Sequence, residues 1–293
     1  TNAAFTNVPT DEHMSPFYGN STGPLTHIFN FGQDSSFAGT ETAQGNKDGN
    51  GIGDFYYAPP TGFRALCSSN LPEPTIGPNS TTQADDYFDI TLYTGNATDD
   101  TAIAVDFQPD WTWIKKRSGT QEHVLFDSSR GATKRLFTNL TNAESDEATS
   151  LKSFTSSGFT LGTHSSVNDN TETFVAWNWK ANGGTTSSNS DGSITSAVQA
   201  STTAGFSIVT FTGTGSNATV GHGLGSKPEW FLIKSRDAST DFTSYHQGIG
   251  ATNRIQISSN EAASASATRF NNTEPTDSVF TVSTSVAVNG SSA

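Results

Sequence analysis

One stretch of the sequence has residue types and spacing that could hold a metal ion. The run from Asp48 to Asp54 reads Asp-Gly-Asn-Gly-Ile-Gly-Asp, which sets oxygen-bearing side chains on a glycine-rich backbone. Calcium loops use this combination, because Ca²⁺ prefers carboxylate and amide oxygens and glycines let the loop fold around the ion. The run lacks the full spacing of an EF-hand loop and a glutamate at its twelfth position. A plain glycine-rich hairpin loop is therefore the favoured interpretation, with calcium as the alternative, and no metal site is predicted.

The histidines form no recognisable catalytic or zinc-binding motif. The six are His13, His27, His123, His164, His222 and His246. None belongs to a His-Glu-x-x-His motif or to a cluster of cysteine and histidine, so the sequence predicts no zinc site. The nucleophile elbow of the hydrolases, the phosphate-binding loop and the dinucleotide fingerprint are also missing from the sequence. His222 stands in a glycine-rich turn before a strand, a position more typical of a turn residue than of a general base.

The cysteine and the paired carboxylates give no catalytic set either. Cys67, the single cysteine, ends an apolar run without a basic neighbour in sequence, so we expect a small buried hydrophobic residue rather than a nucleophile. The adjacent carboxylates Asp85–Asp86 and Asp99–Asp100 would point apart on a strand and make no glycosidase pair. The sequence therefore predicts no catalytic residue, no cofactor and no enzyme, and it indicates no particular binding residue.

The elements that would position any site come from a stretch that the sequence uses twice. Residues 109–117 read Pro-Asp-Trp-Thr-Trp-Ile-Lys-Lys-Arg, and residues 228–236 read Pro-Glu-Trp-Phe-Leu-Ile-Lys-Ser-Arg. The matched pairs, all 119 positions apart, are Trp111 with Trp230, Ile114 with Ile233, Arg117 with Arg236, Gly131 with Gly250 and Arg135 with Arg254. A constant offset over two separated blocks indicates an internal repeat, and the shared residues are formers of strands and turns.

Short alternating runs around these blocks predict an all-β fold of tandem β-sandwich modules, jelly-roll-like, with long polar loops. We expect part of a β-sandwich over 1–75, with strands at 26–33 and 55–57. After it we expect a first repeated module over 76–183, a flexible linker over 184–204 and a second module over 205–293.

Two further expectations concern the inside of these modules. The second module has no counterpart of the strand expected over 174–179, so it would keep an unpaired edge unless chain beyond residue 293 or a neighbouring chain covered it. The predicted core residues, which alternate with polar neighbours, are Trp111, Trp177, Trp230, Phe206 and Ile233.

The charge balance narrows the classes of partner. The chain has 293 residues and a net charge of −13, which argues against nucleic acid or an anionic membrane as the main partner. No apolar run approaches the length of a transmembrane helix, so no membrane insertion is expected. Many of the basic residues lie in the repeated blocks, which leaves open an anion- or glycan-facing surface. We favour ordinary pairing with the nearby acids Glu122, Asp127, Asp237 and Asp241.

Two parts of the sequence resemble a known group of proteins. The run Phe-Asn-Phe-Gly-Gln over 29–33, followed by 55–67, resembles the C-terminal end of the SPRY-like, concanavalin-type domains in tail proteins of tailed bacteriophages, marine ones especially. The repeated Trp-x-x-Ile-Lys and Gly-Ala-Thr-x-Arg motifs resemble an uncharacterised β-domain that follows such domains. The chain departs from the pattern at both ends, where the SPRY-like part lacks its front and the second module its last strand.

The resemblance implies a structural and receptor-binding part of a tail fibre, located in the virion tail, which recognises a host surface without catalysis. Its expected partners are further copies of itself, most often as a homotrimer, other virion tail proteins, and a glycan or protein of the host surface. The alternative is a secreted bacterial adhesin or carbohydrate-binding array attached to a domain outside these residues.

Overall fold

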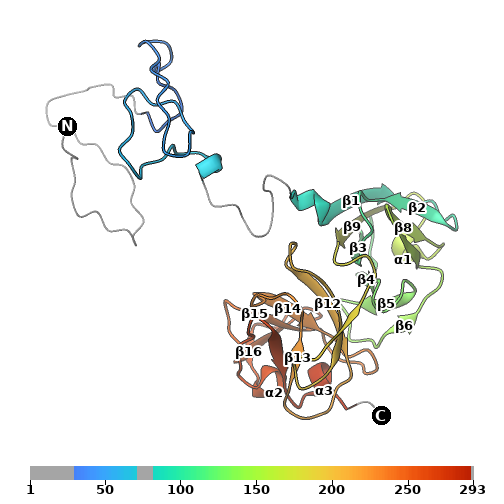
Figure 1. Cartoon of the computed structure of the whole chain (residues 1–293). Helices are drawn as coiled ribbons and strands as arrows, with labels where there is room; N and C mark the ends of the chain where they lie inside the picture. Colours follow the sequence, from blue (N-terminus) through green and yellow to red (C-terminus); the bar gives the residue numbers. More distant parts are fainter. Residues whose placement is uncertain (1–29, 71–81, 292–293) are drawn as a thin grey trace. The chain divides into compact units, whose positions relative to one another are not determined.

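The computed structural model describes residues 30–70 and 82–291 (Figure 1). The chain divides into two compact units, Thr1–Pro72 and Glu73–Ala293. No helix among the described residues is long and apolar enough to cross a membrane.

Within residues 30–70 of the first unit, carboxylate hydrogen bonds hold the chain together more than strands do. Its regular structure within 30–70 is a 3₁₀ helix, η1 (Ser68–Asn70), and a single bridge between Asn46 and Phe55. The strand expected over 55–57 is therefore wrong, and most of the strand expected over 26–33 lies outside the described residues. Ala65 is the one buried hydrophobic residue within 30–70, so strands here would have no core to cover.

The second unit confirms the all-β fold class, with strands that pair antiparallel in several sheets. Its first module contains η2 (Ala84–Asp86), β1 (Phe88–Thr94), β2 (Thr101–Ala104), β3 (Trp111–Lys116), β4 (Val124–Asp127), β5 (Lys134–Phe137), β6 (Ser145–Asp146), β7 (Leu151–Thr155), β8 (Gly158–Leu161), α1 (Ser165–Asn168) and β9 (Thr173–Trp179). A six-stranded sheet in the order β1-β9-β3-β4-β5-β6 packs over a three-stranded sheet in the order β2-β8-β7. The buried cluster between them includes Ile114, Phe126, Phe159 and Phe174.

The second module is drawn from yellow through orange to red in Figure 1. It contains β10 (Ser187–Asn189), β11 (Ser196–Ser201), β12 (Phe206–Phe211), β13 (Ala218–Gly221), β14 (Trp230–Ile233), β15 (Thr243–His246), β16 (Asn253–Gln256), β17 (Ser264–Ala265), α2 (Ala267–Phe270), β18 (Val279–Val282) and α3 (Val286–Asn289). Its sheets have the orders β10-β11-β12, β14-β15-β16-β17 and β13-β18. The flexible linker expected over 184–204 is wrong, because β10 and β11 lie there and extend the sheet of β12. Low-complexity composition concealed β11, in which Ser196, Val198 and Gln199 are buried.

The two modules repeat one register of strand pairing. Trp111 on β3 pairs with Asp127 on β4, and Trp230 on β14 pairs with His246 on β15, so both partners shift by 119 positions. The chain after β14 therefore follows the course that it takes after β3. Two elements differ: α2 stands where the first module has β7, and no described strand of the second module corresponds to β9.

Trp111 and Trp113 lie on the outer face of the large sheet, not in the cluster between the two sheets of the first module. On β3 the fully buried residues are Thr112 and Ile114, and Trp111 alternates with them and is half-buried. Trp230 is 51% exposed, so its expected place in the core is wrong. Trp111, Trp177 and Phe206 are also only partly buried, whereas Ile233 is buried as predicted. Alternation marks two faces of a strand, but it does not say which face meets the core.

Candidate functional site

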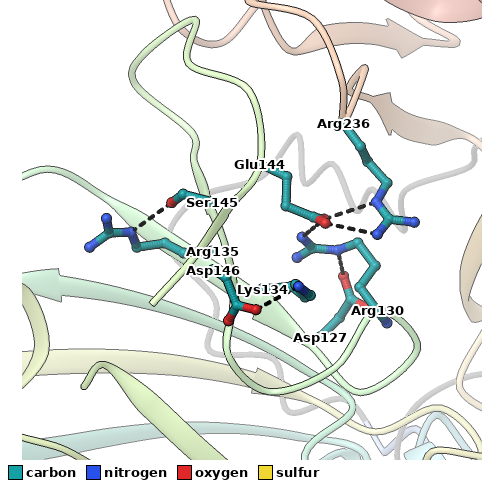
Figure 2. A network of polar contacts seen from close by, with 8 residues as sticks. All are labelled: Asp127, Arg130, Lys134, Arg135, Glu144, Ser145, Asp146 and Arg236. Atoms are coloured by element: carbon teal, nitrogen blue, oxygen red, sulfur yellow. Dashed lines mark hydrogen bonds and ion pairs between the residues drawn. The ribbon is translucent and has the colours of Figure 1, made fainter. Parts of the chain in front are cut away.

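A network of charged side chains joins the two modules, and Figure 2 shows Glu144 at its centre. Arg236, just beyond β14, donates from Nε to Glu144 Oε2 (2.9 Å) and from Nη2 to Glu144 Oε1 (2.8 Å). From the other side, Arg130 donates from Nη1 to Glu144 Oε2 (2.7 Å) and from Nε to Asp127 Oδ2 (2.5 Å). The backbone amide of Glu144 also donates to the carbonyl oxygen of Arg236 (2.8 Å). One carboxylate thus bridges a guanidinium of each module, with two charge-assisted hydrogen bonds from Arg236 and one from Arg130.

Burial makes this network electrostatically strong. The side chain of Arg130 is 4% exposed and that of Glu144 is 12% exposed. Burial alone would raise the pKa of Glu144, but the hydrogen bonds from Arg236 and Arg130 outweigh it and hold the pKa below the ordinary value. The pKa of Arg236 is raised, chiefly by its hydrogen bond to Glu144. Both groups therefore stay charged at neutral pH, as a bridging ion pair requires.

The network breaks the internal repeat. Positions 119 residues after Asp127, Arg130 and Glu144 carry His246, Ile249 and Ala263. Because these three residues differ, the second module cannot form the same network with a segment of chain that follows it. A sequence comparison of the two modules could have found the junction from these three mismatched positions. The matched positions alone do not show the junction.

Apolar contacts accompany the ion pairs. Phe242 of the second module is buried against Leu125 and Leu136 of the first. The ring of Phe206 lies 6.3 Å from that of Trp111, centroid to centroid. Gln199 on β11 is fully buried and donates to the hydroxyl of Ser128 (2.9 Å). The outer face of the first module is thus an interface with the second, which explains why it carries large aromatic residues.

A polar groove of about 440 Å³ lies beside this junction, next to Arg236. It is lined by Thr186, Ser187, Ser188, Thr195, Ser196, Ala197, Thr210, Phe211, Thr212 and Arg236. Within the described part of the chain, five of its hydroxyls have no hydrogen-bond partner, those of Thr186, Ser188, Thr195, Thr210 and Thr212. Free hydroxyls beside a guanidinium can bind a polar ligand such as a sugar or a small anion.

The loop considered for calcium uses its oxygens internally. The carboxylate of Asp48 accepts hydrogen bonds from the amides of Asn50 (2.9 Å), Ile52 (3.0 Å) and Ala65 (2.9 Å). The Ala65 bond is the largest cause of the lowered pKa of Asp48. Over residues 30–70 and 82–291, no group of three or more His, Cys, Asp or Glu side chains is placed to hold a metal ion. The loop is organised by Asp48 as a closed turn.

The remaining residues singled out by the sequence are dispersed. Cys67 is exposed, so its expected burial is wrong; it lies beside η1, and residues 30–70 bury one hydrophobic residue, Ala65. Asp99 and Asp100 do not point apart, because they lie in a turn and both contact Lys152 Nζ at 2.8 Å. Asp85 and Asp86 are exposed in η2. These carboxylates lie on separate elements and form no common site with the groove.

The histidines serve local structure where the structure describes them. His222 is buried, accepts from the amide of Leu224 at Nδ1 (3.2 Å), and contacts the carbonyl oxygen of Thr276 through Nε2 (3.2 Å). Burial lowers its pKa. His164 caps α1 by accepting from the amide of Ser166 (3.1 Å). His123 and His246 lie on other elements, and His13 and His27 lie outside the described residues.

The expected pairing of basic residues with nearby acids holds only in part. Of the four acids named from the sequence, Asp127 is the one that makes an ion pair within the described residues, with Arg130. Lys115 and Lys234 instead donate to backbone carbonyl oxygens, those of Gln121 (2.8 Å) and Thr141 (2.9 Å). The contact of Lys234 with Thr141 is a further link between the modules.

The model of a domain of unknown function, DUF7483, matches residues 83–293, a range that covers both modules. The chain therefore belongs to the DUF7483 family. Comparison with the curated proteins and with the solved structures returned no match.

Proposed function

We propose that this member of the DUF7483 family is a structural and receptor-binding component of a bacteriophage tail fibre, which recognises a host surface without catalysis. Two features support the proposal: the resemblance of its sequence motifs to those of tail proteins, and the joining of two β-modules into one unit. The observation that carries it is the groove at the junction, where five hydroxyls lack partners within the described residues and Arg236 lies at the edge.

The groove suits a sugar in chemical terms. Each serine or threonine hydroxyl can both donate and accept, as the hydroxyls of a sugar do. Arg236 uses Nε and Nη2 for Glu144, and its Nη1 has no hydrogen-bond partner among the described residues. An acidic sugar would place its carboxylate against that guanidinium. The ligand class that we propose is therefore a surface glycan, preferably an acidic one.

Binding to a glycan array by the full chain tests the proposal. We expect Thr210→Val and Thr212→Val together to lower glycan binding at least about tenfold. The ligand hydroxyls that bind these two threonines would lose their hydrogen-bond partners. The matched control is Thr203→Val, an exposed threonine in the turn between β11 and β12. Equal binding by all three proteins, or binding to no glycan, would contradict the proposed ligand class.

The assembly state and the location are part of the same proposal. A homotrimer associated with other tail proteins would present the groove several times, and multivalency would raise a weak single-site affinity. Light scattering on the purified chain at micromolar concentration measures the assembly, with a mass of three chains expected. The alternative, a secreted adhesin or carbohydrate-binding array, would use the same groove and differ in location.

A further inference from the structure

Two large apolar side chains are exposed together on the outer face of β1, the terminal strand of the six-stranded sheet. Ile90 is 53% exposed and Leu92 is 60% exposed, and they lie two positions apart, on the same face of the strand. The other large exposed apolar residues of 82–291, Trp230 and Val286, lie singly on β14 and at the start of α3. Single residues of this kind are ordinary on a protein surface, whereas neighbouring ones mark an interaction site.

These side chains continue the interface between the two modules. Ile90 lies opposite Trp177 on β9 in the register of the sheet. The ring of Trp177 lies 5.6 Å from that of Trp113, centroid to centroid, and Trp113 packs against the cluster that contains Phe242 of the second module. The second module therefore covers one part of this outer face, and the part over β1 stays exposed. We call Ile90, Leu92 and Trp177 the β1 patch.

The β1 patch lies on a face without charge. The outer positions of β1 and β9, which are alternate residues from Phe88 to Thr94 and from Thr173 to Trp179, hold aromatic, aliphatic and threonine side chains. The charged residue of β1, Asp89, lies on the opposite face and accepts from the hydroxyl of Thr91 (2.5 Å). Because the chain has a net charge of −13, two copies repel each other least where their surfaces carry no acid. This face is therefore suited to contact with a second copy.

The two borders of the face carry opposite charges. At the free edge of β1, residues 89–92 and 104–106 line a hollow of about 270 Å³, and Asp106 is exposed there. On the other side of β9, the exposed Arg117 follows β3, and its backbone amide donates to the carbonyl oxygen of Thr173 (2.7 Å). Neither the Asp106 carboxylate nor the Arg117 guanidinium has an ion-pair partner within the described part of the chain. An acidic border and a basic border thus flank one apolar face.

We propose that the β1 patch is the surface through which copies of this chain join. Around a symmetry axis the patches pack against one another, and the border of one copy with Asp106 meets the border of the next copy with Arg117. Head-to-tail contacts between two different borders close into a ring when the rotation allows it. The proposal rests on the proposed function for the number of copies, three, and it names the surface that holds them together.

Light scattering on the full chain and two lysine variants tests the patch. Leu92→Lys places a charge inside the patch, and the control Val286→Lys places the same charge at a similarly exposed apolar position outside it. We expect the wild type and Val286→Lys to have the mass of three chains at micromolar concentration. Leu92→Lys should weaken association at least about tenfold, because it brings like charges together in the contact. A mass of three chains for Leu92→Lys, or of one chain for the wild type, would overturn the proposal.

An exchange of charges tests the borders and keeps the net charge of the chain. Arg117→Asp and Asp106→Arg should each weaken association, because each variant sets like charges against each other, and the double variant should restore it. A double variant that associates no better than the single ones would overturn the head-to-tail contact.

The glycan array separates this contact from the proposed recognition. A wild type that binds glycan as a single chain would keep the recognition and overturn the contact. A wild type with the mass of three chains that Leu92→Lys dissociates, but that binds no glycan, would support the contact and contradict the recognition.

Discussion

Glu144 of the first module receives the guanidinium of Arg236 of the second in a bidentate pair, with nitrogen–oxygen distances of 2.9 and 2.8 Å. The same carboxylate also binds Arg130, whose side chain is almost fully buried. Neither Glu144 nor Arg130 has a matching residue in the other module, so the pair belongs to the junction and not to the repeated fold. Glu144 therefore holds the two modules together beside the apolar contacts of Phe242 and the hydrogen bond of Gln199 to Ser128.

Removing that carboxylate should destabilise the second unit. Glu144→Ala leaves the buried Arg130 with Asp127 as its one remaining acidic partner, and we expect a loss of about 3 kcal/mol in the free energy of unfolding, measured in urea. The control is Glu261→Ala, an exposed carboxylate 4.0 Å from Arg254, which should cost less than about 0.5 kcal/mol. Similar losses for the two variants would show that Glu144 is an ordinary surface charge.

The same residue should make stability depend on pH. The folded state lowers the pKa of Glu144 below its ordinary value of 4.5, so its contribution is fully present above that value and is lost as the pH falls through the lowered folded pKa. We expect the stability difference between the wild type and Glu144→Gln to stay constant between about pH 5 and 7 and to shrink in more acidic solution. Urea unfolding at a series of pH values measures it, and a difference independent of pH would contradict the assignment.

The repeated tryptophans should differ in energetic weight although they occupy equivalent register positions. Trp111 packs on Trp179 with ring centroids 4.5 Å apart, so Trp111→Ala should cost about 3–4 kcal/mol. Trp230 is half-exposed and its main anchor is a hydrogen bond from Nε1 to the hydroxyl of Ser244 (2.7 Å), so Trp230→Ala should cost about 1 kcal/mol. Thermal or urea unfolding of the two variants compares these losses in the free energy of unfolding directly. Equal losses would contradict the difference in environment between the two tryptophans.

Close backbone contacts beside the short helices give a fourth test. A Cβ on Gly95 would lie 2.2 Å from the carbonyl oxygen of Asp169, and one on Gly213 would lie 2.1 Å from that of Gly290. Both Gly95→Ala and Gly213→Ala should therefore cost about 1–3 kcal/mol in the free energy of unfolding. In the comparison variant Gly119→Ala, the added carbon would lie 3.1 Å from Cε of Lys116, a side-chain contact and not a backbone one, so we expect a smaller loss. A neutral Gly213→Ala would argue against the equivalence of the two helix ends.

The sequence predicted those parts of the fold that depend on local pattern. The offset between Trp111 and Trp230 locates equivalent strands because pairing register follows from strand length and turn length, which both blocks share. It could not place Trp230 inside or outside, because burial depends on which face of the sheet meets the second layer. β11 was missed because serine, threonine and alanine dominate the tract around Val198, and pairing with β12 supplies the order that composition conceals.

The candidate site was harder to predict for a related reason. Glu144 and Arg236 are 92 positions apart, and only the folding of both modules brings their side chains together. The groove hydroxyls look like any other residues of a polar loop until β10, β11 and β12 align them. A comparison that looked for mismatches between the repeats would have pointed to Glu144, Arg130 and Asp127, but not to Arg236, which matches Arg117.

The central claim, that the chain is a recognition component of a tail fibre, is tested most directly by electron microscopy of intact particles labelled with an antibody raised against residues 83–293. The account predicts label on the tail fibres of the particles, with pre-incubation by the antibody preventing attachment to host cells. Label confined to cell surfaces or secreted material, with unlabelled particles that attach normally, would contradict it.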